Sequence, residues 1–385
     1  MKIVLLSNYL NHHMLPLCRA FSAQEGVSFW FIATKEITEY RKALGYTSYN
    51  RDYEFVLRAY ESNEKYSEAK RLCDECDVLI YGNAPWDLIR KRLKTKKLTF
   101  RYSERVYKKP CPWYQIPLRA IKYNWMYGRN RNLFLLCASA YTAGDYAKTR
   151  TFLNRAFKWG YFPDVKKYDD VSVVIKEKKK RTLLWCGRLI DWKHPEQAIA
   201  VAKRLREDGI DCTLNMIGSG PMEQKMRDLV SLEGLEGCVR LLGSMSPDRV
   251  RKHMEESEIY LFTSDRQEGW GAVLNESMNS ACVVVASHAI GSVPFLINDG
   301  ENGFVYRDGD EDDFYQKVKA LCDSPSERAR LGRQAYETIV GEWNAEVAAQ
   351  RLIALSKRIL GGEQPTSIYV NGVCSKAELL KDGWR

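Results

Sequence analysis

Short apolar runs alternate with amphipathic segments along most of the chain. Typical runs are Lys2–Ser7, Phe29–Ala33, Asp77–Gly82, Thr182–Cys186 and Val283–Ser287. Each run holds four or five consecutive apolar residues and ends near a polar turn, which is typical of a strand buried on both faces of a parallel sheet. The segments between the runs have helical periodicity. The alternation predicts an α/β protein with doubly wound parallel sheets.

The alternation occurs twice, and the stretch Gly160–Pro163 with the charged segment 166–181 separates the two parts. We therefore expect two Rossmann-like domains, at 1–163 and 164–360, facing each other across a cleft, and a polar tail at 361–385.

The helical periodicity also predicts individual helices. In the first half it predicts one over Ala143–Asn154, and in the tail a short helical piece over Ser375–Leu380. In the C-terminal domain we expect helices at 195–208, 221–233, 247–256, 271–280, 310–322, 325–340 and 345–360.

The stretch Glu268–Glu276 combines two carboxylates with a glycine-rich turn. It follows the apolar run Ile259–Thr263 and leads into a predicted helix, so Glu268 is expected at the carboxyl end of a strand and Glu276 two turns into the helix. A helix N-terminus binds anions, glycines let a ligand approach the backbone, and open α/β sheets bind ligands at the carboxyl ends of their strands. Two carboxylates beside a phosphate-sized pocket indicate a sugar nucleotide. The spacing by itself is also common in surface charge.

Two cations lie on the turn after the first strand of the C-terminal domain. Arg188 and Lys193 suit a diphosphate, Arg188 by bidentate hydrogen bonds and Lys193 as a point charge. The alternative is a solvated basic loop. A second glycine turn contains Gly218, but the chain has neither a Walker A loop nor a G-x-G-x-x-G fingerprint. Cys73 and Cys76 form a lone CxxC pair, which is weak evidence for a metal or redox site.

Several motifs, taken in order, carry a resemblance to a known family. They are Gly187-Arg188-Leu189 with Lys193, Gly218-Ser-Gly-Pro221, Glu268 with Glu276, Val284-Val-Ala-Ser287, Gly291, and Asp299-Gly with Gly303-Phe-Val305. From residue 182 to residue 360 the chain resembles the C-terminal domain of the family 4 glycosyltransferases, which are retaining enzymes of the GT-B fold. The resemblance implies the same fold and the same kind of reaction here.

The resemblance also implies roles at the matching positions. Glu268 would face the donor sugar and the reacting centre, Glu276 would bind the ribose hydroxyls, and Arg188 and Lys193 would hold the diphosphate. Backbone N–H groups of the turn would contact sugar and phosphate, and two loops would hold the base, most often uracil. The turn residues are Gly269, Trp270, Gly271, Val273 and Leu274. The residues of the two loops that would hold the base are Gly218 and Met245.

The resemblance implies a reaction that needs no metal and no cofactor besides a UDP-sugar co-substrate. Asp308-Gly-Asp310 has the form of a metal-binding DxD motif, but it precedes a predicted helix and is better interpreted as a cap. The family usually reads Glu-Ala-Met-Ala-x-Gly-x-Pro from the second glutamate, whereas this chain reads Glu276-Ser-Met-Asn-Ser-Ala281-Cys-Val283. The change alters a loop, not a charged ligand.

The N-terminal half is expected to bind the acceptor, and there the resemblance is weaker. Asn11, His12 and His13 follow the first strand, where many relatives have a Gly-Gly loop. A histidine at this point could orient an acceptor hydroxyl, or it could be part of a helix cap with a partly buried ring. Glu104 ends another predicted strand and is a second acceptor candidate, with a local salt bridge as the alternative.

The charge of the chain is unevenly distributed. Residues 1–165 carry 28 Lys and Arg against 15 Asp and Glu, so their net charge is +13 within a total of +10. In segment 105–131, cations alternate with aromatic and aliphatic residues, which fits an interfacial helix on an anionic leaflet, where each cation contributes about 1 kcal/mol. Such a surface could also bind a lipid-linked diphosphate. The alternatives are nucleic-acid binding, for which no known module is present, and an ordinary basic helix packed on the domain.

Cysteine usage and hydropathy indicate the compartment. The 11 cysteines are odd in number and scattered, which fits reduced thiols. The first residues form a strand-like run that does not resemble a signal peptide, and no apolar run reaches the roughly 18 residues of a spanning helix. We expect a cytoplasmic protein, peripheral to the inner face of the plasma membrane.

These observations predict a retaining glycosyltransferase. It would move a hexose from a UDP-sugar to a hydroxyl of a glycan, lipid-linked, in the synthesis of a bacterial capsule, exopolysaccharide or lipopolysaccharide. Two alternatives stay open: a sugar-nucleotide epimerase of the same fold, and a non-catalytic protein that binds membranes or glycans.

Overall fold

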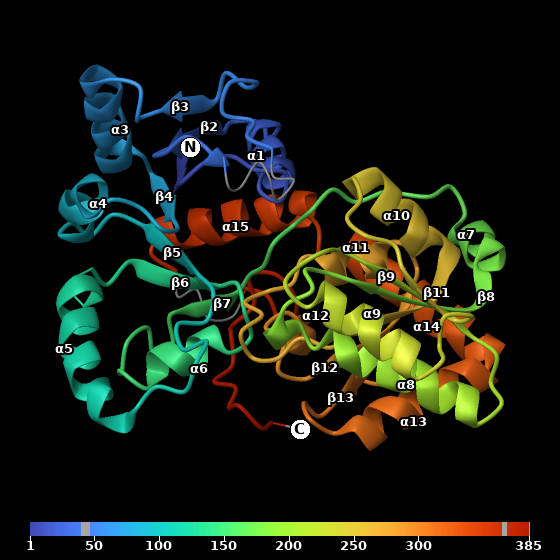
Figure 1. Ribbon diagram of the computed structural model, residues 1–385. Coiled ribbons are helices and arrows are strands. Elements are labelled where there is room, and N and C mark those ends of the chain that lie inside the picture. The colour runs from blue at the N-terminus through green and yellow to red at the C-terminus, as the bar shows by residue number, and fades with distance from the viewer. Residues whose placement is uncertain (40–46, 129, 364–367, 385) are drawn as a thin grey trace. The chain divides into compact units, whose positions relative to one another are not determined.

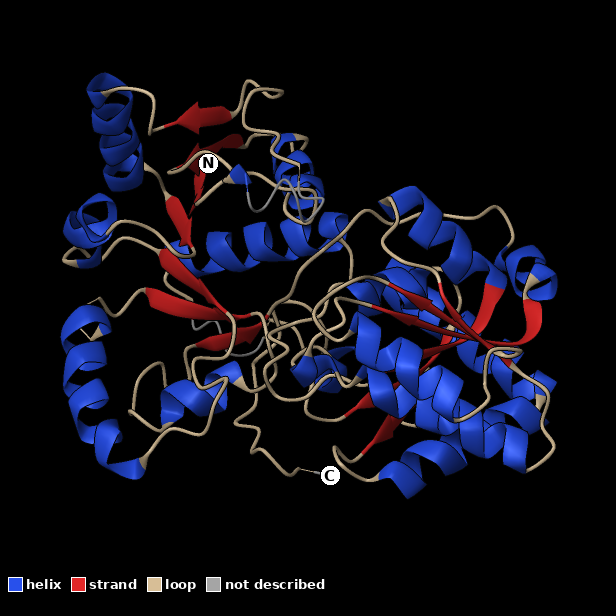
Figure 2. Ribbon diagram, viewed as in Figure 1, coloured by secondary structure: helices blue, strands red, loops and turns tan. Residues whose placement is uncertain are grey.

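The computed structural model of the 385-residue chain describes residues 1–39, 47–128, 130–363 and 368–384. The chain forms two compact units, each built on a parallel sheet with helices on its faces (Figures 1 and 2). Unit 1 comprises Met1–Asp164 and Trp343–Lys381, and unit 2 comprises Val165–Glu342 and Asp382–Arg385.

The sheet of unit 1 has seven parallel strands in the order β3-β2-β1-β4-β5-β6-β7. They are β1 (Lys2–Ser7), β2 (Ser28–Ala33), β3 (Val56–Arg58), β4 (Val78–Tyr81), β5 (Thr99–Ser103), β6 (Leu133–Cys137) and β7 (Ala156–Lys158). All four residues of β4 and all five of β6 are buried, as expected for strands that are covered on both faces. The apolar runs of the sequence are therefore strands.

The helices of unit 1 cover both faces of its sheet. They are α1 (Leu15–Ser22), α3 (Asn63–Glu75), α4 (Trp86–Leu93), α5 (Ile116–Tyr127), α6 (Thr142–Ala147) and α15 (Ala345–Leu360), with the 3-10 turn η1 (Trp113–Gln115) before α5. In Figure 1, α3, α4 and α5 line one side of the sheet, and α1 and α15 lie together on the other.

The last helix lies in unit 1, not in the C-terminal domain where the sequence placed residues 345–360. The apolar face of α15 packs against α1 and covers that face of the unit 1 sheet. Burial of such a face stabilises by about 25 cal/mol per Å². Helical periodicity indicates that α15 needs a partner surface but cannot tell which sheet provides it.

The predicted helix at 375–380 is also absent from the structure. Lys376 instead bridges Phe157, and the backbone N–H of Lys158 donates to the carbonyl of Ser375 over 2.8 Å. The segment therefore forms hydrogen bonds with backbone groups of the edge strand β7 that have no neighbouring strand. The helix predicted over Ala143–Asn154 is shorter than expected, because α6 ends at Ala147 and Arg150 (φ 53°) is the first of several residues with positive φ.

The sheet of unit 2 has six parallel strands in the order β10-β9-β8-β11-β12-β13. They are β8 (Lys179–Cys186), β9 (Thr213–Ile217), β10 (Val239–Leu241), β11 (Ser257–Phe262), β12 (Val283–Ser287) and β13 (Phe304–Tyr306). Leu183, Ile259 and Val283 pair across its centre and are completely buried.

Six of the predicted segments are helices of unit 2, and the described part of the unit has two further helices, at 171–177 and 293–296, that the sequence did not predict. The helices of unit 2 are α7 (Val171–Glu177), α8 (Pro195–Glu207), α9 (Glu223–Leu232), α10 (Pro247–Glu256), α11 (Val273–Asn279), α12 (Val293–Leu296), α13 (Glu311–Asp323) and α14 (Pro325–Gly341), with the 3-10 turn η2 (Asp191–Lys193). The side chain of Asp310 accepts a hydrogen bond from the backbone of Asp313 over 2.9 Å, so the interpretation of this aspartate as a helix cap is confirmed.

Candidate active site

Lys193 and Glu268 lie at one edge of the unit 2 sheet. Parallel pairing places the carboxyl ends of β8, β9, β10 and β11 at this edge. The strand order reverses between β8 and β11, and a crevice that binds ligands is expected at such a switch point. Lys193 follows β8 and Glu268 follows β11, so the two loops that flank the switch point carry them.

The side chains of Lys193 and Glu268 form an ion pair. Lys193 Nζ donates to Glu268 Oε2 over 2.5 Å, and Ser264 Oγ donates to the same oxygen over 3.1 Å. The two charged side chains are only 12% and 13% exposed. A shielded pair interacts more strongly than one in bulk water, so it fixes the cation and the carboxylate relative to each other.

The backbones of the two loops are tied together as well. The N–H of Asp265 donates to the carbonyl of Trp192 over 2.9 Å, and Thr263 Oγ1 donates to the carbonyl of Lys193 over 2.6 Å. Thr263 Oγ1 in turn accepts from Trp185 Nε1 of β8 over 2.9 Å. The turn that carries Lys193 is therefore held to the loop that leads to Glu268.

His194 has an unusual backbone conformation directly after Lys193. Its φ of 46° and ψ of 54° are left-handed, which costs a residue with a Cβ about 1–2 kcal/mol. The ring lies between two carboxylates, with Nδ1 3.1 Å from Glu196 Oε1 and Nε2 3.7 Å from Asp265 Oδ2. Asp265, and then Glu196, raise the pKa of His194 to about 10. In the sequence this histidine had no signal beyond its place after Lys193.

Glycines allow close packing of the loops at this edge. A Cβ on Gly218 would lie 1.8 Å from the carbonyl oxygen of Gly187, and a Cβ on Gly271, where φ is 81°, would lie 2.4 Å from the ring of Phe262. Only glycine fits either position. Gly218 is thus needed for the packing of the β8 and β9 loops, whatever it contacts in a ligand.

Glu276 lies in the first turn of α11, and the expectation that it lies two turns into the helix is wrong. The helix begins only at Val273, because the positive φ of Gly271 is incompatible with a helical turn. Burial raises the pKa of the Glu276 carboxyl, and the nearby Arg251 partly opposes this shift. The side chain is half-buried.

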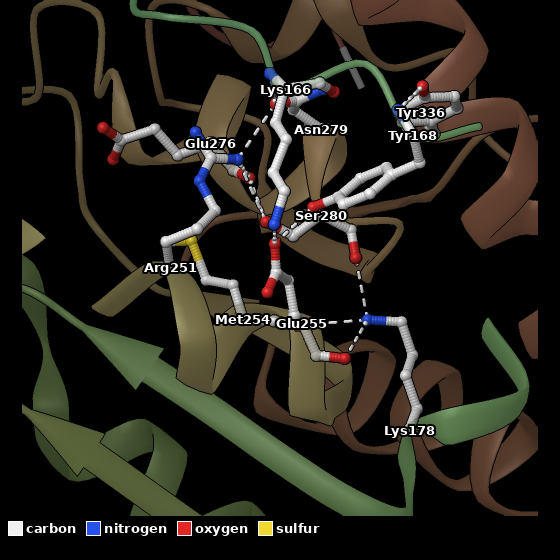
Figure 3. Close-up of polar contacts among 10 residues, drawn as sticks. All are labelled: Lys166, Tyr168, Lys178, Arg251, Met254, Glu255, Glu276, Asn279, Ser280 and Tyr336. Carbon is white, nitrogen blue, oxygen red and sulfur yellow. Dashed lines mark hydrogen bonds and ion pairs between the residues drawn. The ribbon is translucent and has the colours of Figure 1, made fainter. Parts of the chain in front are cut away.

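A polar network supports the backbone of Glu276 (Figure 3). Arg251 Nη1 donates to the Glu276 carbonyl over 3.1 Å and to Asn279 Oδ1 over 3.0 Å. Asn279 also holds the backbone of Lys166 on both sides, accepting from its N–H over 2.8 Å and donating to its carbonyl over 3.0 Å. The Glu276 carboxylate points away from this network (Figure 3). Asn279 belongs to the stretch that departs from the family pattern.

Lys178 anchors the ends of two helices in the same region (Figure 3). Its Nζ donates to the carbonyls of Met254 and Ser257 at the end of α10, over 3.0 and 2.9 Å, and to that of Ser280 after α11, over 2.8 Å. Burial lowers the pKa of this ammonium group. A cation at the carboxyl ends of two helices satisfies carbonyls that have no helical partner.

Other residues of the predicted donor turn are part of the protein core. Trp270 is 1% exposed and donates through Nε1 to Asn275 Oδ1 over 2.9 Å, and Leu274 is completely buried. Their side chains cannot reach a ligand, so any contact would come from the backbone, as the resemblance implies. Gly269 lies on the same turn, and Val273 is half-buried at the start of α11.

Arg188 and Met245 lie on neighbouring loops of the same sheet edge. Arg188 is exposed after β8, and Met245 is half-buried after β10. The loops after β9 and β10 contact each other through the hydroxyls of Ser219 and Ser244, which are 2.8 Å apart. The structure therefore gathers the predicted diphosphate and base residues along three adjacent strand ends, those of β8, β9 and β10, beside the end of β11 that leads to Glu268.

The switch point of the unit 1 sheet lies between β1 and β4, and the loop after β1 holds Asn11, His12 and His13. Asn11 Oδ1 accepts from the backbone of His13 over 3.0 Å and of Met14 over 3.2 Å. This side chain caps the turn before α1. The sequence also allowed a histidine of this loop to be part of the helix cap, but the N-cap of α1 is Met14, which makes no side-chain cap hydrogen bond.

The rings of His12 and His13 lie in contact, with centres 3.9 Å apart and planes tilted by 48°. Burial, and then His12, lower the pKa of His13 to about 3, and burial also lowers the pKa of His12 against the opposing effect of Asp164. Both rings are therefore neutral at neutral pH. His13 lines a small cavity together with other side chains of unit 1, among them Met14, Leu17, Tyr102, Trp159, Tyr161 and Phe162.

Glu104 is linked to the same region through Tyr161. The Tyr161 hydroxyl donates to Glu104 Oε1 over 2.7 Å, and its ring centre lies 6.4 Å from that of His13. Lys108 Nζ pairs with the other Glu104 oxygen at 2.8 Å, so the predicted local salt bridge is also present. Sequence reasoning missed Tyr161, because the aromatic stretch that contains it indicated a domain junction.

Segment 105–131 contains α5, which has two different faces. Tyr123 and Tyr127 pack against Tyr146 of the unit. On the outer side, large apolar residues recur at helical spacing and stay 59–72% exposed. They are Leu118, Ile121 and Trp125 of α5, with Tyr114 of η1 before them.

Among the described residues, no helix is long and apolar enough to cross a membrane. Cys73 and Cys76 are buried, and burial raises the pKa of both thiols, Cys76 to about 11. Within the described part of the chain, no group of three or more His, Cys, Asp or Glu side chains could hold a metal ion.

Residues 168–338 match the profile of a family described as glycosyl transferases group 1. The chain is 28% identical over 177 residues to the alpha-D-kanosaminyltransferase of Streptomyces kanamyceticus, covering 46% of this chain and 45% of that protein. It is 27% identical over 169 residues to the lipopolysaccharide core biosynthesis glycosyltransferase LpsE of Rhizobium meliloti, covering 44% and 47%. The matched region thus spans less than half of these curated relatives.

Solved structures resemble nearly the whole chain. Alr3699/HepE of Anabaena, in complex with UDP, superposes with a TM-score of 0.67 at 13% identity, covering 94% of this chain and all of that one. Sucrose-phosphate synthase of Thermosynechococcus elongatus has a TM-score of 0.61 at 15% identity, with the same coverage. The fold is GT-B, with two parallel-sheet units, as the sequence predicted.

Proposed function

We propose that this chain, whose residues 168–338 belong to the group 1 glycosyl transferases, is a retaining glycosyltransferase that moves a hexose from a UDP-sugar to a glycan hydroxyl. The observation that carries the proposal is the shielded pair of Lys193 and Glu268 at the switch point of the unit 2 sheet. A cation for a leaving phosphate and a carboxylate for sugar hydroxyls are held side by side there.

The donor is proposed to lie along the strand ends of unit 2. Arg188 and Lys193 bind the diphosphate and stabilise negative charge as it leaves. Glu276 accepts hydrogen bonds from the ribose, and the loops with Gly218 and Met245 hold the base. UDP is favoured because HepE, a protein of the same fold, has been crystallised with UDP.

In the proposed reaction, the bond between the anomeric carbon and the β-phosphate oxygen breaks. The acceptor oxygen bonds to the anomeric carbon from the same face, and its proton passes to the phosphate oxygen that leaves. The products are UDP and the extended glycan with retained configuration. This sequence needs no protein nucleophile, and Lys193 and Arg188 supply the positive charge that a metal ion would otherwise supply.

The acceptor is proposed to bind at the switch point of unit 1. The neutral ring of His13 can accept a hydrogen bond from an acceptor hydroxyl or donate one to it. Tyr161 and Glu104 add a hydroxyl and a carboxylate on the same side. We propose roles in acceptor binding for His13, His12 and Glu104, with Asn11 shaping the loop.

The acceptor is further proposed to be lipid-linked and the enzyme to work on the cytoplasmic face of an anionic membrane. The exposed stripe of α5 would lie in the headgroup region, with Lys109 and Lys122 facing anionic lipids. Relatives named for lipopolysaccharide core and amylovoran biosynthesis favour a role in a bacterial surface polysaccharide.

A panel of nucleotide sugars tests this function. Purified protein is incubated with each donor, with and without lipid-linked glycans, and release of nucleoside diphosphate is measured. We expect release from one UDP-hexose. Interconversion of donor sugars without transfer would favour the epimerase, and absence of both activity and UDP binding in calorimetry would favour the non-catalytic alternative.

Glu268→Gln tests the role of the carboxylate within this function. The substitution removes the negative charge and leaves the Lys193 ammonium without its partner. We expect kcat for UDP release to fall at least ~100-fold, because electrostatic groups at a reacting centre contribute on that order. Glu236→Gln, at an exposed position of unit 2, is the control and should behave as the parent protein. Unchanged transfer by Glu268→Gln would rule out the assigned role.

A further inference from the structure

We infer that His194 is a positioning residue that joins the loop of Lys193 to the loop of Glu268, and thereby sets the distance between the cation and the carboxylate. This inference rests on the proposed function for its meaning in catalysis. Its structural part concerns only unit 2 and can be tested without transfer activity.

The first observation is the backbone of His194. The left-handed conformation lets the chain turn sharply between η2 and α8, with the N–H of His194 bonded to the carbonyl of Asp191 over 3.0 Å and its own carbonyl bonded to the N–H of Gln197 over 3.1 Å. Glycine adopts this conformation without strain, whereas residues with a Cβ, including histidine, adopt it only uncommonly. A strained residue next to a site points to a role for its side chain.

The second observation is the pair of carboxylates that hold the ring. Glu196 lies in the first turn of α8, and Asp265 lies three residues before Glu268. The imidazole therefore joins the start of one element to the loop of another, with contacts of 3.1 and 3.7 Å. It is charged when both contacts form, which agrees with the raised pKa of this histidine.

Asp265 links the imidazole ring of His194 to the turn that carries Glu268. Its Oδ1 accepts from the backbone N–H of Gln267 over 2.7 Å, and its carbonyl accepts from the N–H of Glu268 over 3.1 Å. Its own N–H donates to the carbonyl of Trp192. A shift of Asp265 would thus move the turn that presents Glu268, and with it the partner of Lys193.

Other charged groups near the ring do not replace this bridge. Asp308 also interacts with His194, and burial raises the pKa of its carboxyl. Lys225 acts on Glu196 from α9. Lys193 points its ammonium group to Glu268 instead of Asp265. The ring of His194 is the group that lies between Asp265 and the start of α8.

The variant His194→Gly tests the bridge, because it removes the ring and keeps the left-handed backbone accessible. We expect kcat for UDP release to fall by about 10- to 100-fold, on the order of what a displacement of about 1 Å costs, while the Kd for UDP rises less than about threefold. Added imidazole should restore at least part of kcat, since a quarter of the side chain is exposed (27%) and small molecules can reach the site. His253→Ala, at a half-buried position of α10, is the control, because alanine keeps the helix.

Hydrogen exchange supplies a readout that does not depend on activity. In His194→Gly the N–H groups of Asp265 and Glu268 should exchange faster than in the parent protein, and imidazole should slow them again. Normal exchange and normal kcat in this variant would overturn the inference. A loss of kcat with a lowered unfolding temperature and no response to imidazole would also overturn it, because the role would then be structural.

The two proposals can fail separately. If the parent protein releases no nucleoside diphosphate, the proposed function fails, and the exchange measurement still decides whether His194 holds the loop. If the parent is active and the variant equals it, only the inference about His194 fails.

Discussion

At residue 271 the backbone turns with a φ of 81°, and the ring of Phe262 lies where a Cβ would be placed. The other residues at this edge of the unit 2 sheet are also held in place by single contacts. Lys193, His194 and Glu268 each depend on a neighbouring loop for their position, so the properties of the site follow from single contacts and not from residue type alone.

The variant Gly271→Ala should be both less stable and less active. An alanine there would have a strained φ and would push the ring of Phe262, and the two effects together cost about 2–4 kcal/mol. Denaturant unfolding measures the free energy of unfolding, and UDP release measures activity. Gly237→Ala, whose added Cβ meets no atom within 4 Å, is the matched control. Equal stability of the two variants would contradict the argument.

The charge of His194 predicts a pH dependence of stability. Because the folded pKa of about 10 lies above the usual 6.5, the stabilisation is complete below pH 6.5 and is lost as the pH rises through 10. The free energy of unfolding should therefore decrease more between pH 7 and pH 10 in the parent protein than in His194→Asn, whose asparagine tolerates the left-handed conformation. Parallel curves of the free energy of unfolding against pH for the two proteins would show that the charge of His194 does not stabilise the folded state.

At the scale of elements, α5 is unusual because its outer face exposes large apolar side chains, which are more common in a protein interior. Leu118 and Ile121 are 72% and 70% exposed, and Trp125 stacks on Trp86 of α4 with ring centres 5.9 Å apart. In Figure 1, α4 and α5 lie on the same side of the unit 1 sheet. Arg90 and Lys91 of α4, and Lys94 after its last turn, are exposed cations. An apolar stripe beside cations is complementary to an anionic lipid surface.

The double variant Leu118→Ser/Ile121→Ser tests this element. We expect binding to vesicles that contain phosphatidylglycerol to weaken at least ~10-fold, since the lost burial of two large side chains amounts to about 2 kcal/mol or more. Sedimentation with vesicles measures it, and vesicles of phosphatidylcholine alone should bind weakly. Leu232→Ser, at an 83% exposed position of unit 2, is the control. Undiminished binding of the double variant would exclude α5 as the contact surface.

At the scale of the whole molecule, the two units differ in the segments of the chain that form them. Unit 2 is formed by a nearly continuous segment, 165–342 with four residues from the end of the chain, whereas unit 1 needs both 1–164 and 343–381. The face of α1 that holds Leu17, Cys18 and Phe21 is buried together with α15. The two units therefore differ in their dependence on the end of the chain.

Fragments of the chain should reflect this difference. The fragment 165–342 is expected to unfold cooperatively and to bind UDP, since the cations and carboxylates of the donor site lie within it. The fragment 1–164 should lack cooperative unfolding, because the surface that α15 covers is exposed. Circular dichroism against temperature and UDP calorimetry measure the two expectations. Cooperative unfolding of 1–164 would contradict the role given to α15.

Local patterns were sufficient for much of this protein. Four or five consecutive apolar residues followed by polar turns indicated the buried strands, because a strand covered on both faces is almost continuously apolar. The same patterns indicated that Lys193 and Glu268 follow two strands, and that Asp310 caps a helix. Parallel strands bring their carboxyl ends to one edge, so this part of the candidate site could be inferred from the sequence.

Long-range packing decided the rest. The sequence by itself determined that residues 345–360 form an amphipathic helix, but only the tertiary structure placed that helix in unit 1, because its apolar face fits more than one sheet in principle. Likewise, the contact of Tyr161 with Glu104 joins residues 57 positions apart, and the bridge of His194 joins two loops about 70 residues apart. Such contacts depend on which distant segments of the backbone meet in the fold. A local pattern of apolar and polar residues does not contain this information.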